Sequence, residues 1–292
     1  TNRADITIGA VTGGSNTLTL TTENNIANAN VTASGNISGV TTLTLLNVGG
    51  TAILSADVDV TTLTVGNTVA NVAFTGNGSS VANAVAFAND GTLTLGTSGG
   101  TQTYNGGLTT TSVGSTVTLN GSLVTSDDAL TLGAATLASD VTLTSAGGAI
   151  STGAITGTST DVLTVTSSGG GTNTISLGAI GGSGNVHNIT ATAGTSITLT
   201  GNVTTANASG NTVSLTAPSI DIGNVTIDTN NTNHDGNISF IVVVCAGLTL
   251  ILLIIRVYPS RDKTSVCSPG FISFNNWSDT PFLSPSNIIL AP

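Results

Sequence analysis

Positive charge is nearly absent from this sequence. Of its 292 residues only four are Lys or Arg, and none of them lies between Arg3 and Arg256. Basic side chains supply most of the affinity of proteins for nucleic acid, and they also hold anionic lipid surfaces. The sequence therefore excludes nucleic acid as a partner, and it counts against binding of acidic lipid or acidic polysaccharide by this stretch.

Large side chains and cysteines are scarce as well. Aromatic residues make up 3% of the chain, charged residues 6%, and Met is missing. The two cysteines, Cys245 and Cys267, both lie near the C-terminus, so no disulfide framework holds residues 1–240. Disordered chains are usually rich in charge and poor in β-branched residues, and this chain is the reverse. Hydrogen bonds and small apolar side chains must hold its fold.

Short runs in which Thr or Ser alternates with an apolar residue recur along the chain. This alternation is typical of a strand with one buried and one solvent-facing side. Copies occupy residues 16–20, 42–45, 62–65, 92–95, 116–119, 129–132, 141–144, 162–166, 174–177, 197–200 and 212–215. Gly and Asn fall between them, as at 13–16, 49–50, 77–78, 120–121, 147–148 and 169–171, and permit tight turns.

The spacing of these runs predicts an all-β repeat fold, a right-handed parallel β-helix (β-solenoid), over residues 1–240. Val, Leu, Ile and Ala are expected to fill a narrow interior, Thr and Ser to stack outside, and Asn to form ladders at the corners. Coils of roughly 22 residues would give about eleven coils and a rod on the order of 50 Å long.

Several stretches resemble the repeats of filamentous-haemagglutinin-like exoproteins. They are ITLTGNVTT at 197–205, NTVSLTAPSIDIGNVTIDT at 211–229, GNISF at 236–240, TQTYNGGL at 101–108 and LTLGAATLASDVTLTSAGGAI at 130–150. The resemblance implies a bacterial adhesin passenger exported by a two-partner or autotransporter route, with a right-handed β-helical rod. It names no functional residue. The family's secretion and translocator domains have no counterpart here, and the chain is predicted to be a fragment or a processed product.

The composition changes abruptly after Phe240. Residues 238–255 carry no charge, and Arg256, Arg261 and Lys263 follow, so residues 238–257 are predicted to be a candidate transmembrane helix with the rod outside the cell. Residues 258–292 form an irregular tail. Two origins fit the change equally: a membrane anchor, or a frameshift that replaced further polar repeats.

Acidic and histidine residues are the candidates for chemistry, and each has a simpler structural interpretation. Two acidic pairs could bind a calcium ion weakly: Asp57 with Asp59 on a strand, and Asp127 with Asp128 at a turn. Both pairs are interpreted instead as solvent-exposed acids. His187 and the pair His234 and Asp235 have no second ligand at metal spacing and are expected in surface loops. The sequence thus predicts no catalytic, cofactor-binding or metal residue.

The predicted function is a structural adhesin rather than an enzyme. The rod would be secreted or displayed on a bacterial cell surface, anchored in the membrane if the tail is genuine, and its partners would be host or neighbouring-cell surface components or extracellular matrix. Ice binding is an alternative because Thr-X-Thr pairs would stack into a flat threonine array, although the loose coil spacing argues against the regularity that ice requires. A carbohydrate-active β-helix enzyme is a third, disfavoured by the missing basic residues.

Overall fold

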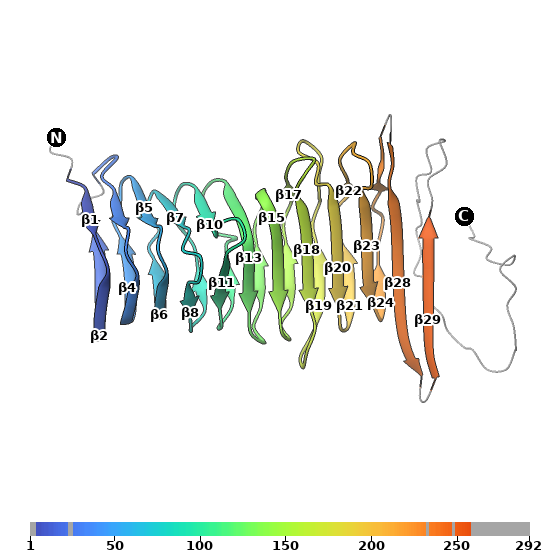
Figure 1. Ribbon diagram of the computed structural model, residues 1–292, viewed down its shortest axis with the longest axis horizontal. Helices are drawn as coiled ribbons and strands as arrows, with labels where there is room; N and C mark the ends of the chain where they lie inside the picture. The colour runs from blue at the N-terminus through green and yellow to red at the C-terminus, as the bar shows by residue number, and fades with distance from the viewer. Residues whose placement is uncertain (1–3, 23–25, 232–233, 247–248, 258–292) are drawn as a thin grey trace, which may run out of the picture.

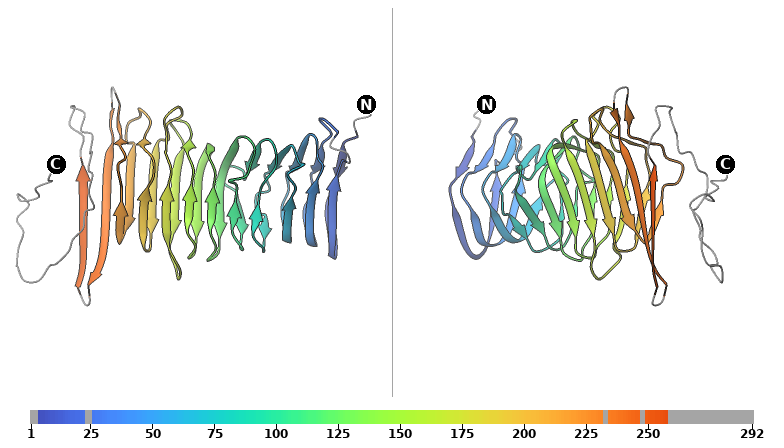
Figure 2. Two further views of the ribbon diagram at one scale, coloured as in Figure 1. Left: turned by 180° about the vertical axis from the view of Figure 1, so that it is seen from behind. Right: turned by 45° about the vertical axis from the view of Figure 1, so that its right-hand side comes forward.

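The computed structural model is an all-β parallel β-solenoid of about 10 turns, which confirms the predicted fold class. It describes residues 4–22, 26–231, 234–246 and 249–257. The coils stack along one axis into a rod, with β1 at one end and β28 and β29 at the other (Figure 1). Two further views show the same succession of coils from behind and at an angle (Figure 2). Each coil contributes strands to three faces, here named A, B and C.

Face A is the first strand position of each coil. Its strands pair in parallel with their equivalents in the neighbouring coils, and Ile180 joins the ladder through single bridges. They are β1 (Ile6–Ile8), β3 (Val31–Ala33), β5 (Thr51–Leu54), β7 (Asn71–Phe74), β10 (Leu93–Leu95), the first parts of β13 (Val117–Thr125) and β15 (Ala135–Ser145), β17 (Ile155–Thr156), β22 (Val203–Thr204) and β25 (Ile227–Asp228).

Face B follows in each coil and continues into the C-terminal strands. Its strands are the first parts of β2 (Val11–Thr21), β4 (Ile37–Leu46) and β6 (Val58–Val65), then β8 (Ser80–Val81), β11 (Thr101–Tyr104), the second parts of β13 and β15, β18 (Val162–Ser167), β20 (Asn188–Ala193), β23 (Thr212–Ala217) and β28 (Asn237–Ala246).

Face C closes each coil. In the first coils it consists of the second parts of β2, β4 and β6. It then passes to a separate sheet formed by β9 (Val85–Ala86), β12 (Leu108–Thr109), β14 (Leu130–Leu132), β16 (Ile150–Thr152), β19 (Thr174–Leu177), β21 (Ser196–Leu199) and β24 (Ser219–Asp221). Outside the three faces, β26 (Asn230–Asn231) and β27 (His234–Asp235) form a small antiparallel pair.

Coil length varies while the strands stay in register. From Val117 to its partner Ala135 the coil spans 18 residues, and from Ile155 to its partner Ile180 it spans 25. The surplus residues form loops between the faces, so they do not shift the ladder. The predicted runs therefore all lie in strands, but on three different faces, and their loose sequence spacing reflects loops rather than irregular stacking.

One predicted turn is instead a bend inside a strand. β13 runs through Asn120 and Gly121 from face A to face B, with a register shift between Leu119 and Gly121. Gly121 has a φ of 63°, and a Cβ at this position would lie 2.3 Å from the carbonyl oxygen of Thr97. Glycine is required here because a side chain would be strained and would also collide with the neighbouring coil.

The interior is narrow and filled as predicted by small aliphatic residues. Inward positions alternate with outward ones in strands such as β13 and β18, and Leu43, Leu123 and Val165 are fully buried examples. Burying such side chains stabilises the rod by about 1.5–3 kcal/mol each relative to exposure. Three aromatic residues interrupt this pattern: Phe74 lies 6.5 Å from Phe87 and 6.4 Å from Tyr104 between ring centroids.

Asn side chains link successive coils at the corners, although not by pairing amide with amide. The side-chain oxygen accepts a hydrogen bond from a backbone N–H in the next coil. Asn30 accepts from Thr51 at 2.9 Å, Asn71 from Thr92 at 2.9 Å, and Asn202 from Thr226 at 2.9 Å. These bonds satisfy backbone donors at positions where no strand partner is available.

The predicted helix over residues 238–257 is replaced by strands. β28 adds in parallel to β23, and β29 (Thr249–Val257) pairs with β28 in antiparallel orientation from Ile238↔Val257 to Ala246↔Thr249. The physical reason is that β23 offers an open edge of N–H and C=O groups, and the run is rich in β-branched Ile and Val, which favour strands. Hydropathy describes only the residues of the run itself and so could not reveal the edge of β23 with which the run pairs.

In the described part of the chain, no helix is both long and apolar enough to span a membrane. The predicted tail 258–292 lies outside the described residues.

Candidate functional site

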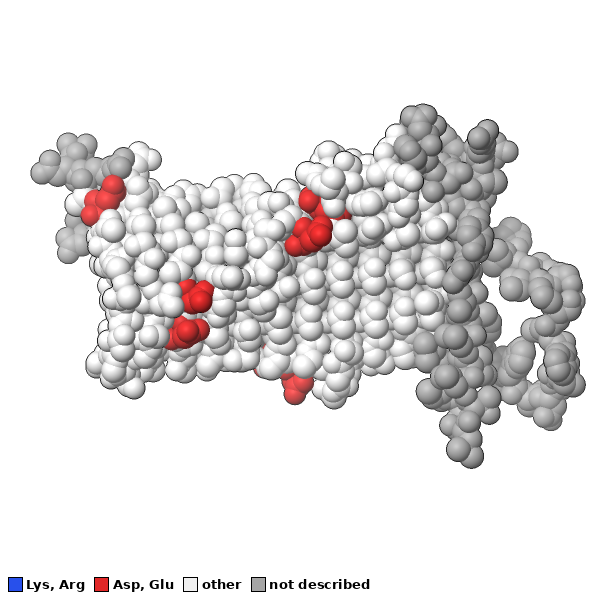
Figure 3. Space-filling model, in the orientation of Figure 1, with Lys and Arg blue, Asp and Glu red and all other residues white. Residues whose placement is uncertain are grey.

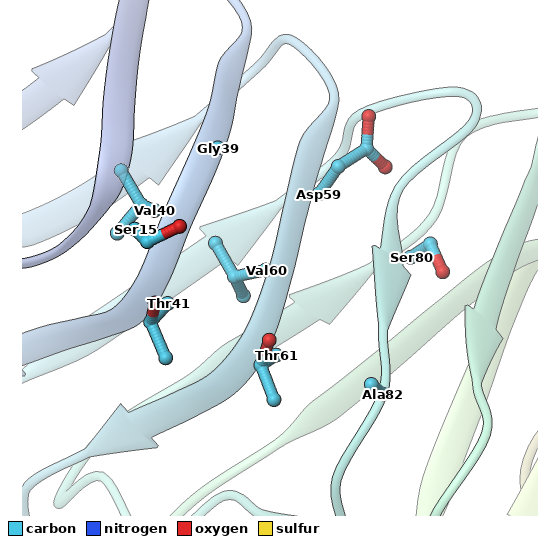
Figure 4. A pocket seen from close by; sticks show the side chains of 9 residues that line it. All are labelled: Ser15, Gly39, Val40, Thr41, Asp59, Val60, Thr61, Ser80 and Ala82. Atoms are coloured by element: carbon cyan, nitrogen blue, oxygen red, sulfur yellow. The ribbon is translucent and has the colours of Figure 1, made fainter.

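A shallow groove crosses β4, β6 and β8 on the outside of the N-terminal half. It has a volume of about 310 Å³ and its floor includes Val40 and Val60 (Figure 4). The hollow exists because small residues follow one another across neighbouring coils. The lining consists of Ser15, Gly39, Val40, Thr41, Asp59, Val60, Thr61, Ser80 and Ala82.

The groove combines hydroxyl groups with one carboxylate. Asp59 is exposed at its rim and is the only lining residue that carries a charge. Hydrolysis of a glycosidic bond requires a pair of carboxyl groups facing one another, one as acid and the other as base or nucleophile. The lining offers a single carboxylate, so this groove can hydrogen-bond a neutral polar group but does not form such a pair.

Asp57 and Asp59 have different roles in the structure. Asp59 lies on the outward side of β6, as the sequence predicted, whereas Asp57 immediately precedes that strand, with Val58 buried between them. The Oδ1 of Asp57 accepts a hydrogen bond of 2.7 Å from the backbone N–H of Gly78 in the next coil. Asp57 therefore links two coils, whereas Asp59 lines the groove.

Replacing Asp57 with alanine is expected to lower the free energy of unfolding by about 1–3 kcal/mol, because the Gly78 N–H loses its charged acceptor. Asp59→Ala is the matched control, and we expect a change within about 0.5 kcal/mol for this exposed side chain. Urea denaturation followed by circular dichroism measures both. Equal effects of the two variants would contradict the role assigned to Asp57.

Asp127 and Asp128 lie at the turn between β13 and β14 and are both exposed, as predicted. The turn is held by hydroxyl groups underneath it. The Thr125 Oγ1 donates a hydrogen bond of 2.8 Å to the Asp128 carbonyl oxygen, and Ser145 Oγ donates one of 3.1 Å to the same oxygen. Ser167, the equivalent residue one coil further, donates to the Gly148 carbonyl at 2.7 Å. These contacts hold the backbone of the turn at a corner of the coil, through the Asp128 carbonyl oxygen rather than through its carboxylate.

The histidines do not come together. His187 is partly exposed in a loop, where its backbone N–H donates to the Asp161 carbonyl at 2.8 Å and its Nε2 lies 3.4 Å from the Ser209 carbonyl. His234 and Asp235 form β27, which pairs with β26. Among the described residues there is no group of three or more His, Cys, Asp or Glu arranged to hold a metal ion.

A buried polar cluster was not predicted from the sequence. Tyr104 and Gln102 point inward from β11 and are fully buried. The Tyr104 hydroxyl donates to Gln102 Oε1 at 2.9 Å, and Gln102 Nε2 donates to the carbonyl oxygens of Phe74 at 2.9 Å and Gly76 at 3.2 Å. Burial raises the pKa of Tyr104 well above its ordinary value. The only sign of this cluster in the sequence is the alternation in Thr-Gln-Thr-Tyr, which does not show whether the two Thr residues or the Gln and Tyr residues face inward.

The fold and the site together define a class, the β-solenoid repeat proteins, and no more specific identity. Comparison with protein-family models, with curated proteins and with solved structures gives no match to this chain. The solenoid is compatible with a β-helical repeat protein.

Proposed function

We propose that the chain is a non-catalytic rod segment of a bacterial adhesin of filamentous-haemagglutinin type. The observation that carries this proposal is the repetition of outward-facing Thr, Ser and Asn side chains over successive coils. On face A, for example, Thr94, Thr118, Thr136 and Thr156 occupy one continuous ladder. Such a surface offers the same neutral hydrogen-bonding groups many times, without concentrating them at one position.

Weak repeated contacts suit adhesion. Each hydroxyl on an exposed face adds little binding energy, but contacts on a stiff scaffold act together when several coils meet the same surface. The solenoid supplies the stiffness because the strands of successive coils are hydrogen-bonded to one another on all three faces. Partners that fit are polar components of host or neighbouring-cell surfaces or of extracellular matrix, met by a secreted or surface-displayed rod.

If binding is distributed over the rod, deleting whole coils should weaken adhesion, whereas substituting a single residue should not. Residues 155–179 form one complete coil, because Ala154 and Ala179 precede the paired residues Ile155 and Ile180. Deleting 135–179 removes two coils and joins Ala134 to Ile180 in the same register. We expect this deletion to weaken retention of protein-coated beads on an epithelial-cell monolayer and on an extracellular-matrix gel.

Point variants provide the comparison for that deletion. Substituting one outward Thr, such as Thr118→Ala, is expected to leave bead retention unchanged, because it removes one hydroxyl among many. Circular dichroism verifies that each variant folds. A single substitution that abolishes bead retention would contradict distributed binding. Beads that carry the intact chain but are not retained on either surface would count against adhesion itself.

A carbohydrate-active enzyme is the competing function, because parallel β-helices also carry such sites and the groove at Asp59 is open to solvent. It predicts release of reducing ends from pectin-like polysaccharide, with loss of activity in Asp59→Asn. We propose instead that the intact chain releases none.

A further inference from the structure

Eight hydroxyl side chains form a two-column array on face B in the C-terminal half of the rod. One column is formed by the partners Thr142, Thr164, Thr190 and Ser214, and the neighbouring column by Thr144, Thr166, Thr192 and Thr216. We call this set the hydroxyl grid. It lies on β15, β18, β20 and β23, which run side by side in Figure 1, and the corresponding area of Figure 3 is a surface of regular rows.

The grid is regular in both directions. Parallel strands lie about 4.8 Å apart, and alternate residues of a strand about 6.6 Å apart, so these two spacings fix the positions of the side chains. No register shift interrupts the pairing of these four strands. The unequal coil lengths, which argued against a regular face, are absorbed in loops at the corners. One column extends further, to Ser122 on β13 and Ser239 on β28.

The hydroxyls of the grid are available to solvent. All eight residues are partly exposed, and none of their side chains hydrogen-bonds to another described protein group. Hydroxyls at the adjoining corner behave differently: Ser145 and Ser167 are fully buried and donate to backbone carbonyls. The shorter Thr array on face C is also different, because Thr62 accepts a hydrogen bond of 2.8 Å from Asn83. Hydroxyl groups without a hydrogen-bond partner in the protein can bond only to water or to a ligand that lies on the sheet.

The chemistry of the grid is uniform and neutral. The segments that carry the grid, residues 141–145 of β15 and the strands β18, β20 and β23, contain no charged residue. Asp140 lies at the edge of the grid, two residues before Thr142, and its Oδ1 accepts a hydrogen bond of 2.9 Å from the Val162 N–H. The threonine side chains are stiff about χ1, which holds each hydroxyl and methyl group in a defined place. Face B also offers no exposed aromatic ring for stacking on a sugar, since Tyr104 is fully buried and Phe240 packs against the core.

We propose that the hydroxyl grid binds the surface of ice. Ice is a neutral lattice that exposes hydrogen-bonding oxygens at fixed repeats of a similar size to the strand spacing. A rigid, uncharged grid of unpartnered hydroxyls and methyl groups can order water at its own spacing and join that layer to the crystal. This activity is independent of adhesion to cells, and either can fail without the other.

The test is thermal hysteresis of the purified full chain, with the shape of growing ice crystals as a second measurement. The full chain is expected to depress freezing below melting and to give faceted crystals. Thr166→Lys places a long hydrated charge in the middle of the grid and is expected to reduce the hysteresis to that of buffer. Thr118→Lys, on face A in a similarly paired strand, is the matched control and should retain the activity.

Two results would overturn the proposal. Absence of hysteresis and of crystal shaping in the full chain removes it, and so does an equal loss in Thr118→Lys and Thr166→Lys. Circular dichroism and thermal melting exclude unfolding as the cause. If Thr166→Lys unfolds the rod, Thr166→Val tests the same hydroxyl, because it keeps the methyl shape and lowers the hysteresis only if the hydroxyl takes part.

Discussion

Gly178→Ala is expected to lower the free energy of unfolding by about 1–3 kcal/mol, at the upper end of that range for an overpacked interior. Gly178 is buried at the corner between faces C and A. A Cβ at this position would lie 2.4 Å from the carbonyl oxygen and 2.6 Å from the carbonyl carbon of Gly153 in the preceding coil. Because both contacts are with backbone atoms, no side-chain rotation relieves them, and the two coils must separate.

The control for this variant is another glycine of the same part of the rod. A Cβ on Gly170 would meet no atom within 4 Å, and we expect Gly170→Ala to change stability by no more than about 0.5 kcal/mol. Urea denaturation gives the midpoints of both variants. Hydrogen exchange at the Gly178 amide, which donates to the Thr152 carbonyl at 3.0 Å, locates the effect. Similar midpoints for both variants would show that the coils are less tightly stacked than the structure indicates.

The second large effect concerns alkaline pH. Burial holds Tyr104 in its neutral form and raises its pKa, whereas an unfolded chain releases the same proton near pH 10. Above that pH the unfolded state binds fewer protons than the folded state, so the free energy of unfolding falls as pH rises. Below it the contribution of Tyr104 is fully present. We therefore expect the rod to lose stability progressively above about pH 10.

Tyr104→Phe separates the two roles of this residue. At neutral pH it should cost about 1–3 kcal/mol, because the buried Gln102 Oε1 loses its only hydrogen-bond donor among the described residues. Above pH 10 its stability should fall less steeply than that of the unmodified chain. In a Tyr258→Phe background Tyr104 is the sole tyrosine, and phenolate absorbance should then appear together with unfolding. Ionisation of Tyr104 in a chain that is still folded would contradict its burial.

The strands could be predicted from the sequence far better than their arrangement. All the alternating runs lie in strands, because alternation with β-branched residues is a local property. Their distribution over three faces could not be predicted, since runs of the same type occur on face A at Leu93–Leu95, on face B at Val162–Ser167 and on face C at Thr174–Leu177. Only the stacking of coils, which depends on residues about 20 apart, separates them.

For the candidate residues, the sequence predicted positions better than contacts. The sequence correctly placed Asp59 on a strand and Asp127 and Asp128 at a turn, whereas Asp57, which was expected on the same strand, immediately precedes β6. It did not reveal that Asp57 bonds the next coil while Asp59 lines a groove, because that difference depends on where Gly78 lies. The Thr-X-Thr pairs were visible, but their regularity was hidden by loops of unequal length between them.

Composition and alternation in the sequence are sufficient to predict a rod of stacked short strands without Lys or Arg between Arg3 and Arg256, because short alternating runs can bury their small apolar residues only against one another. The tertiary structure alone decided which hydroxyls are free and which are bonded, and that the apolar run after Asn237 pairs as strands at the end of the rod. The physical reason is the same for both. A parallel strand finds its hydrogen-bond partners in the coils above and below, so its surroundings are set by residues a whole coil away.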